Sequence, residues 1–344
     1  MSLAYISQQV TIYVGWFFVI AGIGGNGLNI LIFTSVRNYR QTPCTFYFLI
    51  TSIDNIVVLI VSVISRIFIA GYQIDLTLTS TFWCKLRAYL INVLTLISFT
   101  YSCLASIDQF LVTSRNANVR RFSNIKWAHR MMFIVIIVWC LHGIPQILFY
   151  DISSITQTCR IINASYSIYA SIYVLSLTCI IPIVVMIVFG YLTYRNIHLT
   201  RVIRAEQQAD HQLVRMTLIQ VILVVISITP YGINNVYGLI TSTISKDLDR
   251  LTKESFISTI LSLFTYVNYI GTCYMFLISS RRFRRQMDAH LNVLEASQVI
   301  LYHLMKEYTN NGFYLTAHPM TFGNHVQKMI PAQTGGTHGH RRIL

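Results

Sequence analysis

The stretch Ser167–Tyr194, SIYASIYVLSLTCIIPIVVMIVFGYLTY, contains no aspartate, glutamate, lysine or arginine. A helix needs roughly 20 apolar residues to cross the hydrocarbon core of a bilayer, so this stretch is long enough to span it. Six further apolar stretches of similar length carry few charges: Val10–Val36, Cys44–Gly71, Leu86–Thr113, Met131–Tyr150, Met216–Thr243 and Ser255–Ile278. Their apolar residues are continuous, whereas barrel strands alternate apolar and polar residues. The sequence therefore predicts an all-α integral membrane protein with a bundle of seven transmembrane helices.

Composition and charge give the orientation of this bundle. The 344 residues are 54% hydrophobic and only 11% charged, which is far from the balance of a soluble domain. Short cytoplasmic loops carry the excess of lysine and arginine, and one side of the chain collects most of them: Arg37, Arg40, Arg115, Arg120, Arg121, Lys126, Arg130, Arg195, Arg201, Arg204, Arg215, Arg281, Arg282, Arg284 and Arg285. We therefore expect a multi-pass protein of the plasma membrane with its N-terminus outside.

The net charge of +14 favours contact with the anionic lipid of the inner leaflet. Nucleic-acid binding is the weaker alternative, because the basic residues flank the spans and form no separate domain.

Four regions follow from these patterns. Residues 1–9 form a short extracellular N-terminus, and residues 10–280 form the transmembrane domain, whose first span acts as an uncleaved insertion signal. In residues 281–291, Phe283, Met287 and Leu291 repeat at helical spacing beside four arginines. This pattern predicts a short amphipathic helix on the inner leaflet. Residues 292–344 are polar, and we expect a disordered cytoplasmic tail.

Two ionisable residues fall inside the second span. Asp54 lies near mid-bilayer depth and must face the bundle interior, because a carboxylate in lipid is costly. Arg66 lies about three turns further out, and simple snorkelling of its head to water is the favoured interpretation.

Cysteines and a glycosylation sequon mark the outer surface. Cys84 and Cys159 are the two of the seven cysteines that fall outside the spans on the extracellular side. They are the natural disulfide pair, because that compartment oxidises thiols. The sequon Asn163-Ala164-Ser165 lies in the same outer loop, so Asn163 is a candidate glycosylation site.

Several motifs in order along the chain resemble the rhodopsin-like (class A) G-protein-coupled receptors. They are Gly25-Asn26 in the first span, Asp54 in the second, Trp83-Cys84 before the third, Cys103–Phe110 at its inner end, Pro182 in the fifth, Pro230-Tyr231 in the sixth and Ser279–Arg284 after the seventh. The resemblance covers about Ile12 to Met287. It implies a cell-surface receptor that senses an extracellular ligand and signals through helix rearrangement to a heterotrimeric G protein.

Departures from the family concern activation. The family's Asp-Arg-Tyr reads Asp108-Gln109-Phe110 here, so the arginine that contacts the G protein is replaced by Gln109. Its acidic partner at the inner end of the sixth span corresponds to Asp210, and Arg215 follows on the same helix. The resemblance makes Asp108, Gln109, Phe110, Asp210 and Arg215 the candidate activation residues. Further departures are Ile228 at the family's sixth-span tryptophan and Thr272–Phe276 at its Asn-Pro-x-x-Tyr motif.

The resemblance also excludes two classes of ligand. Amine receptors of the family carry an aspartate where this chain has Ile91, and opsins need a seventh-span lysine, yet none occurs between Lys253 and Lys306. What remains is most similar to invertebrate peptide-type receptors, which implies a neuropeptide ligand. For its cavity the outward-opening polar residues of the spans are candidates: Asn92, Thr95, Tyr231, Asn234, Asn235, Ser262 and Tyr266. Hydrogen bonding between helices is the alternative role for each of them.

Asp54, Ser98 and Asn268 match three positions that hold a sodium ion in many family members, and oxygen ligands suit a hard cation. The alternative is that Ser98 and Asn268 satisfy a protonated Asp54. No other cofactor is expected.

Three other functions compete with signalling. A receptor fold that binds ligand or forms heteromers without efficient G-protein coupling would explain Gln109. A transporter or channel would need several buried charges along a pathway, and only Asp54 lies deep. An enzyme is disfavoured because no paired histidine or carboxylate motif recurs at catalytic spacing on one span.

Overall fold

Seven helices long and apolar enough to cross a membrane occur in the part of the chain that the computed structural model describes. They span Leu3–Ser35, Pro43–Gly71, Thr81–Thr113, Ile125–Phe149, Ala164–His198, Gln212–Ile240 and Leu248–Ser279. The described residues are 2–35, 41–153, 157–200, 208–241, 244–279, 283–289 and 292, with only the backbone described for 199, 200 and 208–211. The predicted seven-helix membrane fold is confirmed.

The observed helices are mostly longer than the apolar stretches that predicted them. The first begins at Leu3 rather than Val10, and the last begins at Leu248 rather than Ser255. Polar and charged residues continue a helix beyond the hydrocarbon core because the intrahelical hydrogen bonds persist there. The segment predicted as a short N-terminus thus continues the first helix over its described residues.

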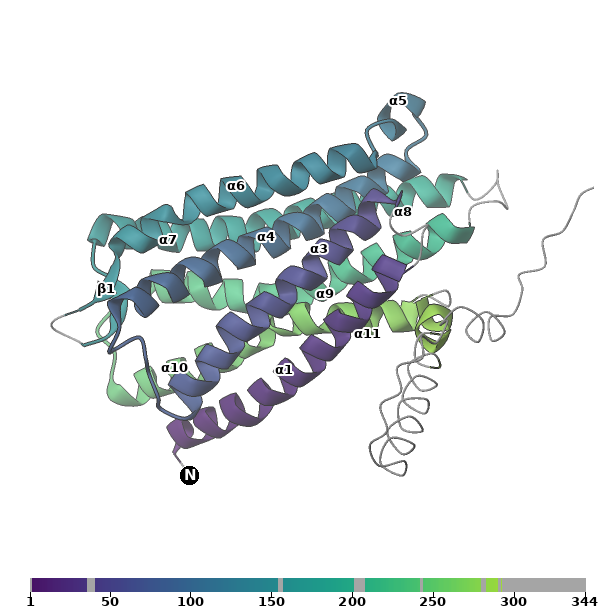
Figure 1. Ribbon diagram of the computed structural model, residues 1–344. Coiled ribbons are helices and arrows are strands. Elements are labelled where there is room, and N and C mark those ends of the chain that lie inside the picture. The colour runs from purple at the N-terminus through teal and green to yellow at the C-terminus, as the bar shows by residue number, and fades with distance from the viewer. Residues whose placement is uncertain are drawn as a thin grey trace, which may run out of the picture. The chain divides into compact units, whose positions relative to one another are not determined.

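The elements follow each other along the chain in a regular order (Figure 1). They are α1 (Leu3–Ser35), α3 (Pro43–Val58), η1 (Leu59–Ile64), η2 (Ile67–Gly71), α4 (Thr81–Thr113), α5 (Ala117–Arg120), α6 (Ile125–Phe149), β1 (Tyr150–Ile152), β2 (Cys159–Ile161), α7 (Ala164–Tyr173), η3 (Val174–Ile180), α8 (Ile181–Thr200), α9 (Gln208–Ile240), α10 (Leu248–Thr265) and α11 (Val267–Ser279). The segments η1, η2 and η3 are π-helical and interrupt the second and fifth spans.

Helix α4 is the centre of the bundle. It packs against α3, α6, α8 and α9 and runs between α3 and α6 (Figure 1). The Ser80 hydroxyl caps its N-terminus by accepting a hydrogen bond from the Trp83 backbone N–H. Its buried residues include several polar ones, among them Ser98, Ser102 and Gln109. A helix buried on several sides can present polar groups to other helices rather than to lipid.

Two apolar clusters fill the interior. One joins Phe33, Phe48 and Phe276 to α4 and α9, and the other joins Leu59 and Ile228 to the middle of the bundle. These clusters fix the spacing of the helices, because close-packed side chains resist displacement.

The two ends of the bundle differ. The antiparallel strands β1 and β2, paired from Tyr150↔Ile161 to Ile152↔Cys159, lie at the same end as the N-terminus (Figure 1). Helix α5 lies at the opposite end. With the predicted orientation, the hairpin is the outer end and α5 the inner end.

Residues 283–289, which follow the last span, are helical. Phe283 is fully buried, and its ring lies 5.9 Å from those of both Phe33 and Phe276. Its side chain therefore faces the bundle, although the sequence pattern placed it on a lipid-facing stripe. Arg281, Arg282 and Leu291 lie outside the described residues, and contact of this helix with the inner leaflet stays a prediction.

The chain divides into two compact units, residues 1–289 and 290–344. Apart from residue 292, the second unit, which includes nearly all of the predicted tail, lies outside the described residues.

Candidate functional site

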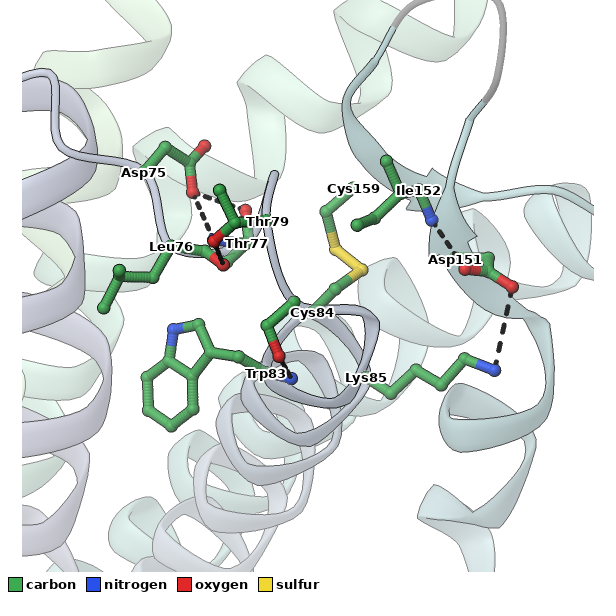
Figure 2. Close-up of a disulfide and its surroundings, with 11 residues drawn as sticks. Asp75, Leu76, Thr77, Thr79, Trp83, Cys84, Lys85, Asp151, Ile152 and Cys159 are labelled. Carbon is green, nitrogen blue, oxygen red and sulfur yellow. Dashed lines mark hydrogen bonds and ion pairs between the residues drawn. A yellow bond between two sulfur atoms is a disulfide. The ribbon is translucent and has the colours of Figure 1, made fainter.

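A disulfide ties the hairpin to the start of α4. Cys84 in the first turn of α4 is bonded to Cys159 on β2 (Figure 2), which confirms the predicted pair. Beside it, Lys85 Nζ lies 3.8 Å from a carboxylate oxygen of Asp151 on β1. This partly exposed ion pair contributes little by itself, so the covalent bond is what holds the hairpin in place.

A cavity of about 610 Å³ lies beneath this hairpin. Its walls come from the second, third, fourth, fifth, sixth and seventh spans and from both strands. The residues with polar side chains or rings that line it include Ser62, Arg66, Asp75, Arg87, Asn92, Thr95, Gln146, Tyr150, Tyr173, Tyr231, Ser262, Tyr266 and Tyr269. The volume is typical of a small-molecule or cofactor site.

The predicted ligand residues divide between two cavities. Five of them line the cavity beneath the hairpin, namely Asn92, Thr95, Tyr231, Ser262 and Tyr266. Asn234 and Asn235 line a neighbouring cavity of about 560 Å³ between α7, α9 and α10. Tyr150, Tyr173 and Val174 line both, so the two cavities adjoin.

Two arginines of the larger cavity were not among the predicted ligand residues. Arg66, which we expect to reach outward to water, lines the cavity, as does Arg87 three residues after Cys84. The sequence did carry a signal, since an ionisable residue within a span marks a functional site by default. The position of Arg66 near the end of its span favours snorkelling when the sequence alone is considered.

Tyr150 closes the cavity from the hairpin side. Burial raises the pKa of its phenol, and the guanidinium of Arg87 opposes this shift. The hydroxyl therefore stays protonated at neutral pH and can donate a hydrogen bond into the cavity.

At the middle of the bundle, Asn55 rather than Asp54 occupies the hydrogen-bonded centre. Its side-chain oxygen accepts a hydrogen bond from Ser98 Oγ at 3.0 Å, and its Nδ2 donates to Asn26 Oδ1 at 3.3 Å. Asn26 in turn donates to the backbone oxygens of Gly22 and Tyr269. This network joins α1, α3, α4 and α11.

The predicted sodium ligands are not joined to one another by hydrogen bonds in the described structure. Asp54 Oδ2 and Asn268 Oδ1 are buried acceptors without a partner there, while Ser98 is engaged with Asn55. Unpaired buried oxygens suit a hard cation in kind. Asp54, Ser98 and Asn268 therefore remain candidate ligands.

The inner end holds the candidate activation residues. Asp108 Oδ1 accepts a hydrogen bond from Ser123 Oγ at 2.6 Å, so the loop after α5 supplies a partner for this carboxylate. The Gln109 side chain is buried and lies near the Cys44 thiol on α3. The same sulfur lies 3.6 Å from Thr217 Oγ1 on α9. Gln109 thus belongs to a polar link between α3, α4 and α9.

Phe110 and Arg215 are the other activation residues whose side chains the structure describes. The Phe110 ring lies 5.5 Å from that of Phe189 on α8, and Arg215 is exposed on α9. The side chain of Asp210 lies outside the described residues.

The predicted glycosylation site begins the fifth span. Asn163 is exposed, and its Oδ1 accepts a hydrogen bond from the Tyr166 backbone N–H at 2.9 Å as the N-cap of α7.

Comparison with known proteins gives the family. Residues 25–279 match the family described as 7 transmembrane receptor (rhodopsin family). No curated protein matches the chain. The match covers most of the chain, with six spans in full and the first in part, so the chain belongs to the rhodopsin family of seven-transmembrane receptors. It is a multi-pass membrane receptor and not an enzyme, and its family implies an extracellular ligand and a G protein as partners.

Proposed function

We propose that this chain is a plasma-membrane receptor that binds an extracellular peptide in the cavity beneath the hairpin and signals to a heterotrimeric G protein. The observation that carries the proposal is the position of this cavity. It opens between the spans at the end where the N-terminus and the disulfide-held hairpin lie, in a chain of the rhodopsin family. A ligand that contacts several spans at once can favour one arrangement of the bundle over another.

The peptide class rests on the resemblance to invertebrate peptide-type receptors and on the two adjoining cavities. Together they extend from the middle of α4 to the outer ends of α7 and α9. An extended ligand could occupy both at once, and a neuropeptide is the ligand class that we propose. The same proposal includes two further points. The receptor is inserted with its N-terminus outside, and its basic inner surface contacts anionic lipid.

A receptor that binds ligand without efficient coupling is the second candidate. Gln109 favours it, because this residue stands where the family has its G-protein-contacting arginine. Buried against Cys44, its neutral side chain offers no charge to a partner protein.

A ligand screen on cells that express the chain separates the two candidates. Binding of a labelled peptide library and second-messenger output are measured in parallel at matched surface expression. The proposal expects peptides that bind and also raise second-messenger levels, whereas the second candidate expects binding alone. Ligand-independent ion flux in vesicles would instead indicate a channel or transporter.

A further inference from the structure

The cavity beneath the hairpin carries an excess of positive charge. Arg66 and Arg87 both line it, against a single carboxylate, Asp75. Asp75 Oδ1 accepts hydrogen bonds from the backbone N–H and the hydroxyl of Thr77, at 2.8 and 2.5 Å (Figure 2). Among the described residues, the ion pairs within 4.0 Å involve other cations, so neither arginine has a carboxylate in salt-bridge contact.

Neither arginine has a carboxylate in contact, although the Asp75 carboxylate attracts Arg87 from beyond salt-bridge distance. Arg87 Nε donates to Ser65 Oγ at 2.8 Å, a neutral partner that orients the guanidinium without neutralising it. Arg66 Nε is buried and has no hydrogen-bond partner in the described structure. The two guanidiniums also lie close enough to repel each other. Both arginines are partly buried. A partly buried charge without a counterion in contact is costly, and two like charges in one cavity add to that cost.

Other unpartnered groups in the cavity wall can also donate. Asn92 Nδ2 and Ser62 Oγ are buried there without a partner, as is Arg66 Nε. A buried donor without an acceptor lowers stability, because it loses its hydrogen bonds to water and gains none. A ligand that supplies acceptors would satisfy these groups, whereas a cationic ligand would leave them unpaired.

The remaining wall suits an aromatic or apolar body. Five tyrosines line it, namely Tyr150, Tyr173, Tyr231, Tyr266 and Tyr269, and their rings provide flat apolar surface with polar tips.

We propose that the ligand presents a carboxylate to Arg66 and Arg87 and places an attached aromatic or apolar group among the tyrosines. A guanidinium binds a carboxylate through two parallel N–H···O bonds, which gives both affinity and orientation. The carboxylate belongs either to a small organic acid or to the C-terminus of a peptide. This inference rests on the proposed function, because both take the cavity beneath the hairpin as the ligand site.

The test uses the full-length chain in nanodiscs of neutral lipid. Its thermal unfolding temperature is measured in the presence of each of four added compounds. The first arm compares 3-phenylpropionate with 3-phenylpropanamide, and the second compares the tripeptide Ala-Ala-Phe with its C-terminal amide, at equal ionic strength. We expect the acid to raise the unfolding temperature more than the matched amide in at least one arm. The arm with the larger shift identifies the source of the carboxylate.

Variants then locate the binding site. Arg66→Gln and Arg87→Gln should each weaken acid binding about tenfold or more, because each removes a charged donor pair. Arg160→Gln is the matched control: Arg160 is an exposed cation of β2 that does not line the cavity, and its loss should leave acid binding unchanged. If a glutamine variant fails to fold, Arg66→Lys and Arg87→Lys keep the charge and should weaken binding through loss of the bidentate contact.

Equal shifts by acid and amide in both arms would overturn the inference, and so would acid binding unaffected by these arginine substitutions. The assay contains no G protein. Acid-selective binding without signalling in cells would therefore contradict the coupling proposal alone, and signalling by a ligand without any anionic group would contradict this inference alone.

Discussion

Asn55 and Asp54 are neighbours in sequence but differ in their surroundings. Asn55 bonds to Ser98 and Asn26, while Asp54 Oδ2 is buried without a hydrogen-bond partner. On a helix, successive residues point about 100° apart, so only one of two neighbours can face a given helix. Asp54 is the only carboxyl group among the predicted sodium ligands.

Substitution of Asp54 tests the predicted sodium site. We expect sodium chloride to stabilise the wild-type protein relative to choline chloride at equal ionic strength, by about 1.4 kcal/mol when sodium is at ten times its Kd. Asp54→Asn should abolish this difference because the amide carries no charge, and the thermal unfolding temperature is the measurement. Asp108→Asn, which neutralises a buried carboxylate at the inner end, should retain it. A sodium effect that survives in Asp54→Asn would show that Asp54 is not a ligand.

Gly143 marks a close approach of α6 to α4. A Cβ added there would lie 2.5 Å from a methyl carbon of Val93 and 2.7 Å from the Tyr89 ring. We expect Gly143→Ala to lower the free energy of unfolding by about 1–3 kcal/mol, because an overpacked contact forces its neighbours to shift. Gly24→Ala, whose added Cβ would meet nothing within 4 Å, is the control. Equal unfolding temperatures for the two variants in one detergent would contradict the prediction.

Among the elements, α9 is tied to the inner ends of α3 and α4 through one sulfur. Thr217 Oγ1 donates to Leu213 O on its own helix, so the Cys44 thiol is the donor between Cys44 and Thr217. The buried Gln109 side chain lies near that same thiol. The contact between Cys44 and Thr217 joins the inner ends of α3 and α9 in the described arrangement. It is neutral, so it is weaker than a link that involves a charged group.

Thr217→Val removes the acceptor of that link while keeping the shape of the side chain. We expect basal second-messenger output to rise about two- to fivefold, since a net loss of about 0.5–1 kcal/mol shifts the equilibrium toward the open arrangement by that factor. Thr229→Val is the control on the same helix, because the Thr229 hydroxyl donates to Val225 O of its own helix. A similar rise in both variants would argue against the link.

Gln109→Arg tests the replaced activation residue. A hydrogen bond with a charged partner is worth about 1.5–3 kcal/mol net, against about 0.5–1.5 for a neutral one. We expect Gln109→Arg to raise maximal ligand-driven coupling by restoring the charge, and the further change Asp210→Ala to raise basal signalling by removing its acidic partner. Equal G-protein output from wild type and both variants, at matched surface expression, would instead support a receptor that binds without coupling.

At the scale of the whole molecule, glycosylation of Asn163 would report which end of the bundle faces the outside. Its Oδ1 caps α7, and a glycan would attach through Nδ2, so capping and glycosylation can coexist. Glycosylation of this site requires that the hairpin end of the bundle face the lumen during synthesis.

Ser165→Ala and Asn163→Gln separate the two roles of this site. We expect both to remove a glycosidase-sensitive mass shift from the expressed protein. Asn163→Gln should in addition lower stability by about 1 kcal/mol through loss of the cap, whereas Ser165→Ala should not, and thermal unfolding of the deglycosylated proteins measures this. A wild-type protein without any glycan would contradict the glycosylation prediction, and an N-terminal epitope inaccessible on intact cells would contradict the orientation.

The sequence by itself determined the seven spans, the class of fold and the disulfide pair. Span length follows from the thickness of the bilayer, and the compartment of Cys84 and Cys159 follows from the order of the spans, so both can be read without any contact between helices. Five of the seven predicted ligand residues also line the larger cavity, because polar groups within spans avoid lipid and turn inward.

Only the tertiary structure decided what Arg66 and Asn55 do. Arg66 lies between the π-helical segments η1 and η2, where i→i+5 hydrogen bonds replace i→i+4 bonds and change the direction of the side chains that follow. No proline or glycine inside Leu59–Arg66 announces this change, so the sequence showed the depth of Arg66 in its span and not the direction of its side chain. Asn55, which follows the predicted sodium ligand Asp54, makes the hydrogen bonds at the centre of the bundle. Which of two adjacent side chains meets Ser98 depends on the rotation of α3 against α4, and that rotation is set by packing across the bundle.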